Sequence, residues 1–202
     1  TVETLLDASA VSIRQSLVQL QFTACSMHRA AVEAVGDTAA DGDRIASRDD
    51  EVDRLFAMIT RHFNRSLTDF AEVDHLDVQR SELFDHYLAA RQLERVADHA
   101  VRIERFAHRA DPDVSDAVLD DVASLADAAR DVVETGTTAV LEAATDRAHE
   151  ALDRRESVVD EALALDQALI ERSPPGAYVL SRVLASLVRT AECGGTVATV
   201  AL

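Results

Sequence analysis

A continuous stripe of apolar residues near the N-terminus, which we call a seam, constrains the fold of this chain more than any other feature. Apolar residues recur there at alternating spacings of four and three positions. They are Leu6, Ala10, Ile13, Leu17, Leu20, Ala24, Met27 and Ala31. This period places them on one face of an α-helix, which must be covered by neighbouring helices. The seam stops at Gly36 and Asp37, where we predict that the helix ends.

Five further segments have the same helical spacing, and together they predict an all-α fold of six long antiparallel helices. The expected helices cover residues 45–63, 83–101, 118–132, 152–170 and 180–201. Connections are expected at 71–79, 111–113 and 143–146. We expect Ser173 to cap the last helix at its N-terminus, because the prolines that follow it are tolerated in a first turn.

The composition excludes the other fold classes. With 6 Gly, 3 Pro and 4% aromatic residues, the chain lacks the turns of a β-sandwich or barrel and the glycine-rich turns of a doubly wound α/β fold. No run approaches the ~20 apolar residues of a membrane span, and no signal peptide opens the chain. Cys25 and Cys193 lie in apolar helical patterns, so we predict buried thiols in a reducing, intracellular location.

The charge is strongly acidic. The chain has 37 Asp and Glu against 20 basic residues, all of them Arg, for a net charge of -17. Such a surface repels itself unless salt screens it, with a Debye length of roughly 3 Å at 1 M. We interpret this as adaptation to a molar-salt cytoplasm, as in a halophilic archaeon; the alternative is an ordinary acidic helical protein. Either surface argues against direct contact with nucleic acid, which requires a basic footprint.

The second half of the chain repeats the first. Residues 48–53 (RDDEVD) align with residues 155–160 (RESVVD), and residues 94–100 align with 188–194. We therefore predict two tandem three-helix bundles, residues 1–110 and 111–202, and an elongated shape. Because a helix begins almost at Thr1 and the last seam is still running at Leu202, we expect a fragment of a longer protein.

Pairs of carboxylates spaced four apart are the candidate site. They are Asp49 with Asp53, Glu94 with Asp98, and Glu156 with Asp160. Each pair shares one helix face and repels itself unless a cation lies between, and Asp49, Glu94 and Glu156 also fall on apolar stripes, where a charge costs more. Two such pairs on adjacent helices would supply hard oxygen donors for Mg²⁺, Mn²⁺, Fe, Ca²⁺ or Zn²⁺. Solvated faces, or ion pairs with Arg95 and Arg189, are the alternative.

These segments resemble the signatures of the PhoU family. Residues 87–100 (YLAARQLERVADHA) are similar to its third-helix signature, and residues 48–55 (RDDEVDRL) to its second-helix signature. Residues 155–160 and 189–192 are similar to the second copy. The resemblance covers the whole chain in the same order. It implies a cytoplasmic regulator of phosphate uptake that works with a phosphate ABC transporter and its signalling proteins, and we expect a homodimer without membrane insertion.

The resemblance also implies metal ions, including iron clusters, bound by the acidic motifs; Fe, Zn, Mg and Mn are the candidates. The first site would use Asp49, Asp53, Glu94 and Asp98. The second would use Glu156, Asp160 and Glu192, with Val188 in place of the expected fourth acid. Some archaeal relatives resemble fusions of an AbrB-like DNA-binding domain to PhoU repeats. A domain of that kind before Thr1 would explain why a helix begins almost at the first residue.

Other motifs carry less weight. Glu72 and His75 have the Glu-x-x-His spacing of a di-iron helix, but this motif occurs once and in a connection. His99 is expected to pack in the core or to support the neighbouring carboxylates. No phosphate loop, Ser/His/Asp set or Cys/His set is present, so we expect no enzyme. Two functions remain: a metal-binding regulatory adaptor of phosphate uptake, or a helical scaffold or oligomerisation module of a transcriptional or cation-transport regulator.

Overall fold

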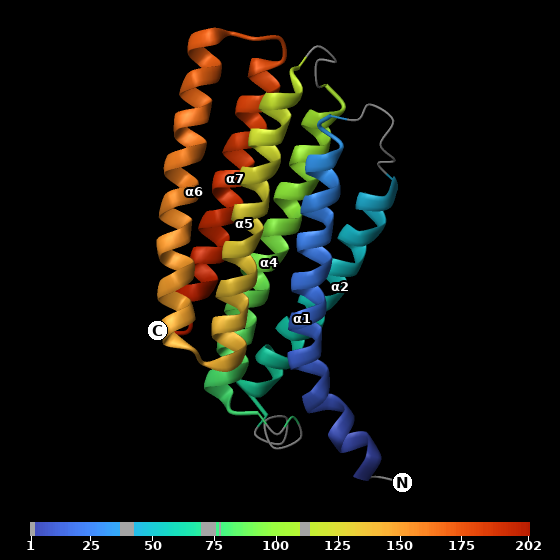
Figure 1. Ribbon diagram of the computed structural model, residues 1–202. Helices are drawn as coiled ribbons and strands as arrows, with labels where there is room; N and C mark the ends of the chain where they lie inside the picture. Colours follow the sequence, from blue (N-terminus) through green and yellow to red (C-terminus); the bar gives the residue numbers. More distant parts are fainter. Residues whose placement is uncertain (1–2, 37–42, 70–75, 77, 110–113) are drawn as a thin grey trace.

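Six α-helices and no strands form the part of the chain that the structure, a computed structural model, describes: residues 3–36, 43–69, 76, 78–109 and 114–202. They are α1 (Glu3–Glu33), α2 (Asp43–Ser66), α4 (Arg80–Ala107), α5 (Asp116–Glu142), α6 (Thr145–Arg172) and α7 (Ala177–Thr199). The predicted all-α class is confirmed. The long helices lie side by side in an elongated bundle (Figure 1).

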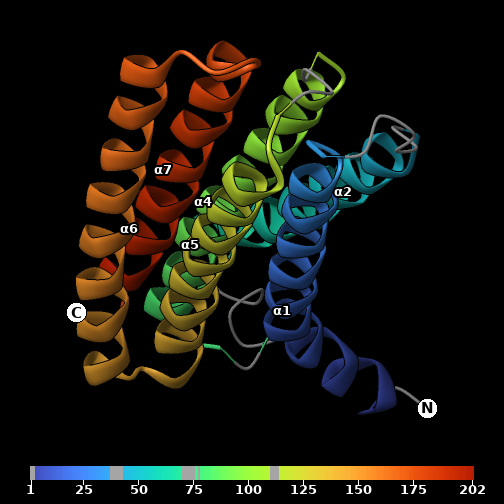
Figure 2. The same ribbon diagram turned by 45° about the horizontal axis from the view of Figure 1, so that its top comes forward.

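The helices pack in two sets of three. Helices α1, α2 and α4 contact one another, as do α5, α6 and α7. The sets meet where α4 packs on α7 and α1 packs on α5 (Figure 2), and one hydrophobic cluster contains side chains from all six helices. The boundary predicted at residue 110 stays a prediction, because residues 110–113 lie outside the described part.

The predicted seams of α1 and α7 form the core. From Ile13 to Ala31 every described member of the first seam is buried, and so are Leu180, Leu184 and Leu187 of the last. Cys25 and Cys193 are buried free thiols, as predicted. Burial raises their pKa values, to about 12 and about 11, so both remain protonated.

The predicted stripe of α6 is wrong. Leu163 and Ile170 are 58% and 65% exposed, and Glu156 is exposed as well. The buried face instead comprises Ala148, Ala151, Val158, Ala162 and Leu169. Helix α6 lies at the outside of the bundle (Figure 1) and approaches its neighbours through alanines, so its bulkier apolar residues do not mark its inner face.

The start of α7 also differs from the expectation. Ser173 does not cap α7 but ends α6, in the left-handed conformation at φ 44°. Helix α7 begins at Ala177 and is preceded by Gly176 at φ 73°, a conformation that glycine adopts without steric cost. The two prolines therefore lie in the connection and not in a first turn.

Helices α5 and α7 approach closely at a pair of glycines. A Cβ atom on Gly194 would lie 2.7 Å from the backbone nitrogen of Val133, and one on Gly136 would lie 2.6 Å from the carbonyl oxygen of Gly194. The close approach explains why α7 tolerates glycine in its interior, where glycine costs about 1 kcal/mol relative to alanine.

No described helix is long and apolar enough to cross a membrane.

Candidate functional site

The first predicted carboxylate set lies on α2 and α4, which pack against each other. On α2, Ile45 and Val52 are buried, and Asp49 lies between them on the same face. On α4, Glu94 follows the fully buried Leu93. The apolar periodicity of each helix therefore holds Asp49 and Glu94 half-buried, while Asp53 and Asp98 are exposed.

The four carboxylates are electrostatic neighbours. Burial raises the pKa of Asp49, and the charges of Asp53, Asp98 and Asp50 raise it further, against an opposing effect of Arg105. The pKa of Glu94 is likewise raised, first by burial and then by Asp98, Asp53 and Asp49. Asp49 is thus affected by two other members of the set and Glu94 by all three, and negative charge accumulates between α2 and α4.

The described part of the chain contains no group of three or more His, Cys, Asp or Glu side chains that could hold a metal ion. The carboxylates of the first set are close enough to repel one another. To ligate one cation, they would have to converge further.

The second predicted set lines one surface pocket of about 560 Å³ between α6 and α7. Glu156 and Asp160 enter it from α6, and Glu192 enters it from α7. Val188, at the place of the missing fourth acid, packs against the hydrophobic core. This set therefore has three donors from two helices.

Two of these three carboxylates form ion pairs with arginines. Arg155 Nη2 donates to Glu156 Oε1 at 3.2 Å, and Arg189 Nη1 donates to Glu192 Oε2 at 2.5 Å. A Cβ atom on Gly195 would lie 2.5 Å from Cδ of Arg155, so the glycine leaves room for Arg155 to cross α7. Arg189 therefore forms the ion pair that was considered as an alternative to metal binding. Arg95, the other arginine considered, forms no ion pair among the described residues.

The remaining candidates fall outside the two sets. Glu72 and His75 lie outside the described residues. His99 is buried, as expected of a packing residue, and its Nδ1 has no hydrogen-bond partner in the described part. A buried pair of His28 and Arg130 between α1 and α5 was not foreseen, because single residues 102 positions apart leave no local pattern.

Comparisons with known proteins agree with this fold. Residues 17–107 match the model of the PhoU domain. The fold is similar to the crystal structure of the phosphate transport system regulatory protein PhoU from Streptococcus pneumoniae, with a TM-score of 0.80 and 14% sequence identity over 97% of this chain and 94% of that one. No curated protein matches the sequence. The matched domain contains all four residues of the first set.

Proposed function

We propose that this chain is a PhoU-type regulatory adaptor, which couples phosphate uptake through an ABC transporter to the phosphate supply of a cell. The observation that carries the proposal is the PhoU domain match over residues 17–107, within a fold that resembles a PhoU regulator along nearly its whole length. The adaptor acts in the cytoplasm, without catalysis of its own, on the transporter and its signalling proteins.

The proposal includes a metal ion at the first carboxylate set. Asp49, Asp53, Glu94 and Asp98 would hold it, and its charge would neutralise the repulsion that raises the pKa values of Asp49 and Glu94. Carboxylate oxygens suit Mg²⁺, Mn²⁺ or Fe. Bound there, an ion would tie α2 to α4 and stabilise the arrangement of the first three helices.

The test is deletion of the gene in its source organism, with phosphate uptake measured in phosphate-rich and phosphate-starved cells. We expect the difference in uptake between the two conditions to shrink or disappear, and the intact gene to restore it. Unchanged uptake in both conditions would contradict the regulatory role.

A second candidate function, a helical scaffold without functional metal sites, is favoured by the ion pairs that occupy Glu156 and Glu192. Restoring the deletion strain with an Asp49→Asn, Glu94→Gln gene separates the two. The metal-binding adaptor predicts that this gene fails to restore regulation, and the scaffold predicts that it succeeds.

A further inference from the structure

A pocket of about 460 Å³ between α4 and α7 is lined by five arginines. Arg102 and Arg105 come from α4, Arg109 from the turn that follows it, and Arg182 and Arg189 from α7. We call this the arginine pocket. It holds five of the 20 basic residues of a chain whose net charge is -17, and no carboxylate of the described residues lines it.

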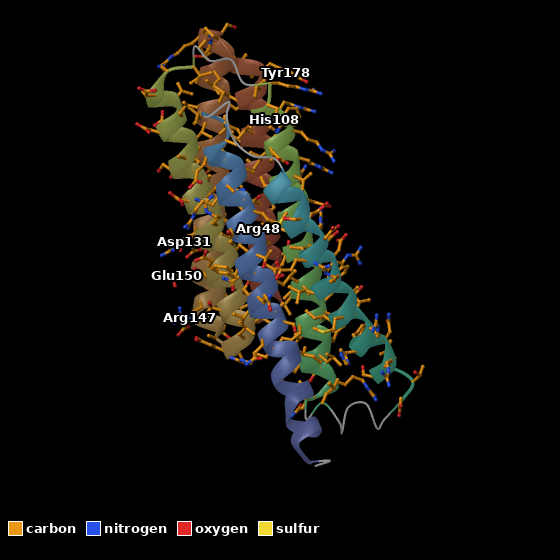
Figure 3. The ribbon with its side chains drawn as sticks, turned by 90° about the vertical axis from the view of Figure 1, so that its right-hand side faces the viewer. Arg48, His108, Asp131, Arg147, Glu150 and Tyr178 are labelled. Atoms are coloured by element: carbon orange, nitrogen blue, oxygen red, sulfur yellow. The ribbon has the colours of Figure 1, made fainter. Side chains whose placement is uncertain are left out.

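The helical spacing of the arginines explains why they meet. Arg102, Arg105 and Arg109 follow one another by three and four positions, and seven positions separate Arg182 from Arg189, so each helix presents one basic face. Helices α4 and α7 run antiparallel, and the end of α4 lies beside the start of α7 (Figure 1). In Figure 3, His108 and Tyr178 mark this end of the two helices.

Four of these arginines have no direct ion-pair partner in the described part of the chain, although the charge of Arg105 acts on Asp49. Among the described residues, Arg102, Arg105, Arg109 and Arg182 form no ion pair, and Arg189 alone is paired, with Glu192. Like charges in one concavity repel, and they focus a positive potential there. In a protein with 37 acidic residues, a cavity whose described lining contains five arginines and no carboxylate is an arrangement that an anion would stabilise.

Contacts within the pocket hold one of its arginines in place. Arg182 lies over the ring of Phe106, 5.7 Å from its centroid, and this contact restricts the guanidinium. Ser186 and the buried His99 also line the pocket. The Nδ1 atom of His99, with no hydrogen-bond partner in the described part, adds an unused polar group.

We propose that the arginine pocket binds a ligand with a chain of two or more phosphoryl groups, either an inorganic polyphosphate or the polyphosphate moiety of a nucleotide. Guanidinium groups match phosphoryl oxygens with paired, charge-assisted hydrogen bonds. A single phosphate group, with a charge of about -2 at neutral pH, would leave most of the five arginines uncompensated. An acidic protein segment longer than the pocket would extend over the acidic surface around it and be repelled.

The test is calorimetric titration of the purified chain with tripolyphosphate, ATP, orthophosphate and sulfate, in 1 M KCl with a chelator present. The salt suppresses weak long-range attraction, and the chelator prevents a metal ion at the acidic set from bridging to phosphate. We expect tripolyphosphate or ATP to bind about tenfold or more tightly than orthophosphate and sulfate. Tighter binding of tripolyphosphate identifies the inorganic ligand, and tighter binding of ATP identifies the nucleotide.

Two double variants make the test specific. Arg102→Gln with Arg109→Gln removes two pocket charges without touching the contact between Arg182 and Phe106, and should weaken binding by about tenfold or more. Arg54→Gln with Arg61→Gln removes two exposed charges from α2, outside the pocket, and should leave binding unchanged. Circular dichroism checks that each variant is folded, and Arg182→Gln replaces the first variant if that one is not.

Three results would overturn the proposal. They are equal affinity for sulfate and tripolyphosphate, equal weakening by both double variants, and tighter binding of an oligo-aspartate peptide than of any phosphate compound. The inference does not depend on the regulatory role proposed above, since it concerns the C-terminal end of α4, beyond Glu94 and Asp98, and a binding measurement alone.

Discussion

Arg130 of α5 donates a hydrogen bond from Nη1 to Nδ1 of His28 on α1, over 3.1 Å, although 102 residues separate the two. Both side chains are buried, and the guanidinium also pairs with the carboxylate of Asp127. Because arginine can only donate, His28 accepts through Nδ1 and is neutral. The pair therefore places a buried polar link between the two sets of helices.

The buried histidine makes the protein sensitive to acid. Burial, then Arg130 and His99, lower the pKa of His28 to about 3, whereas a histidine in the unfolded chain titrates near 6.5. Between these values the unfolded state binds a proton that the native state does not. We therefore expect the free energy of unfolding to fall by up to roughly 1.4 kcal/mol per pH unit as the pH drops from about 6.5 towards 3.

Urea denaturation at a series of pH values measures this slope. The matched variant is His28→Gln, which cannot take up the proton and should show a shallower slope, whatever its stability at pH 7. Equal slopes for the two proteins would show that other groups control the acid response.

The first carboxylate set should respond to metal. The pKa values of Asp49 and Glu94 are raised in the native state, so their contribution to stability is present at low pH and is lost as the pH rises through those values. At neutral pH without metal, Asp49→Asn with Glu94→Gln should thus be at least as stable as the parent. Mn²⁺ should raise the melting temperature of the parent and not that of the variant.

Melting curves with chelator and with excess Mn²⁺ provide this comparison. If chelator leaves the parent unchanged and the double variant melts lower than the parent, Asp49 and Glu94 are structural carboxylates that stabilise the fold without a metal ion, and the result supports the scaffold function.

Metal occupancy should differ between the two carboxylate sets. In the second set, Arg155 and Arg189 already neutralise Glu156 and Glu192, and Val188 supplies no donor. We expect crystals soaked in Mn²⁺ or Zn²⁺ to show the stronger anomalous peak beside Asp49 and Glu94. A stronger peak beside Glu156 and Glu192 would reverse the assignment.

Adjacent glycines of α7 should differ in their tolerance of alanine. At Gly194 the added Cβ meets the backbone of Val133, which cannot move alone, so Gly194→Ala should destabilise by about 1–3 kcal/mol or more. At Gly195 the three atoms nearest to the added Cβ all belong to the flexible side chain of Arg155, which can rotate away, and helix propensity gains about 1 kcal/mol. Thermal melting of both variants checks this, and equal losses would contradict the packing explanation.

Salt should stabilise the fold. With a net charge of -17, repulsion across the surface is poorly screened in dilute buffer, where the Debye length exceeds about 10 Å. We expect helical circular dichroism to decline below about 0.5 M KCl. A melting temperature that does not change from dilute buffer to molar KCl would contradict adaptation to high salt.

The sequence by itself determined the helical class, the positions of most helices and the core faces of α1 and α7. Their apolar residues are large and recur without interruption, and burial of such side chains dominates the free energy of folding. The acidic sets also followed from spacing along single helices, since residues four apart share a face in any α-helix.

Only the tertiary structure decided features that depend on which helix neighbours which. The inner face of α6 consists mainly of alanines, whose pattern is weak because alanine is common everywhere in this chain. The arginine pocket forms only where α4 and α7 lie side by side. The spacing of Arg102, Arg105 and Arg109 indicates a basic face on α4 but not the helix that it faces. The link from Arg130 to His28 left none, because a contact between helices far apart in sequence is fixed by packing and not by local periodicity.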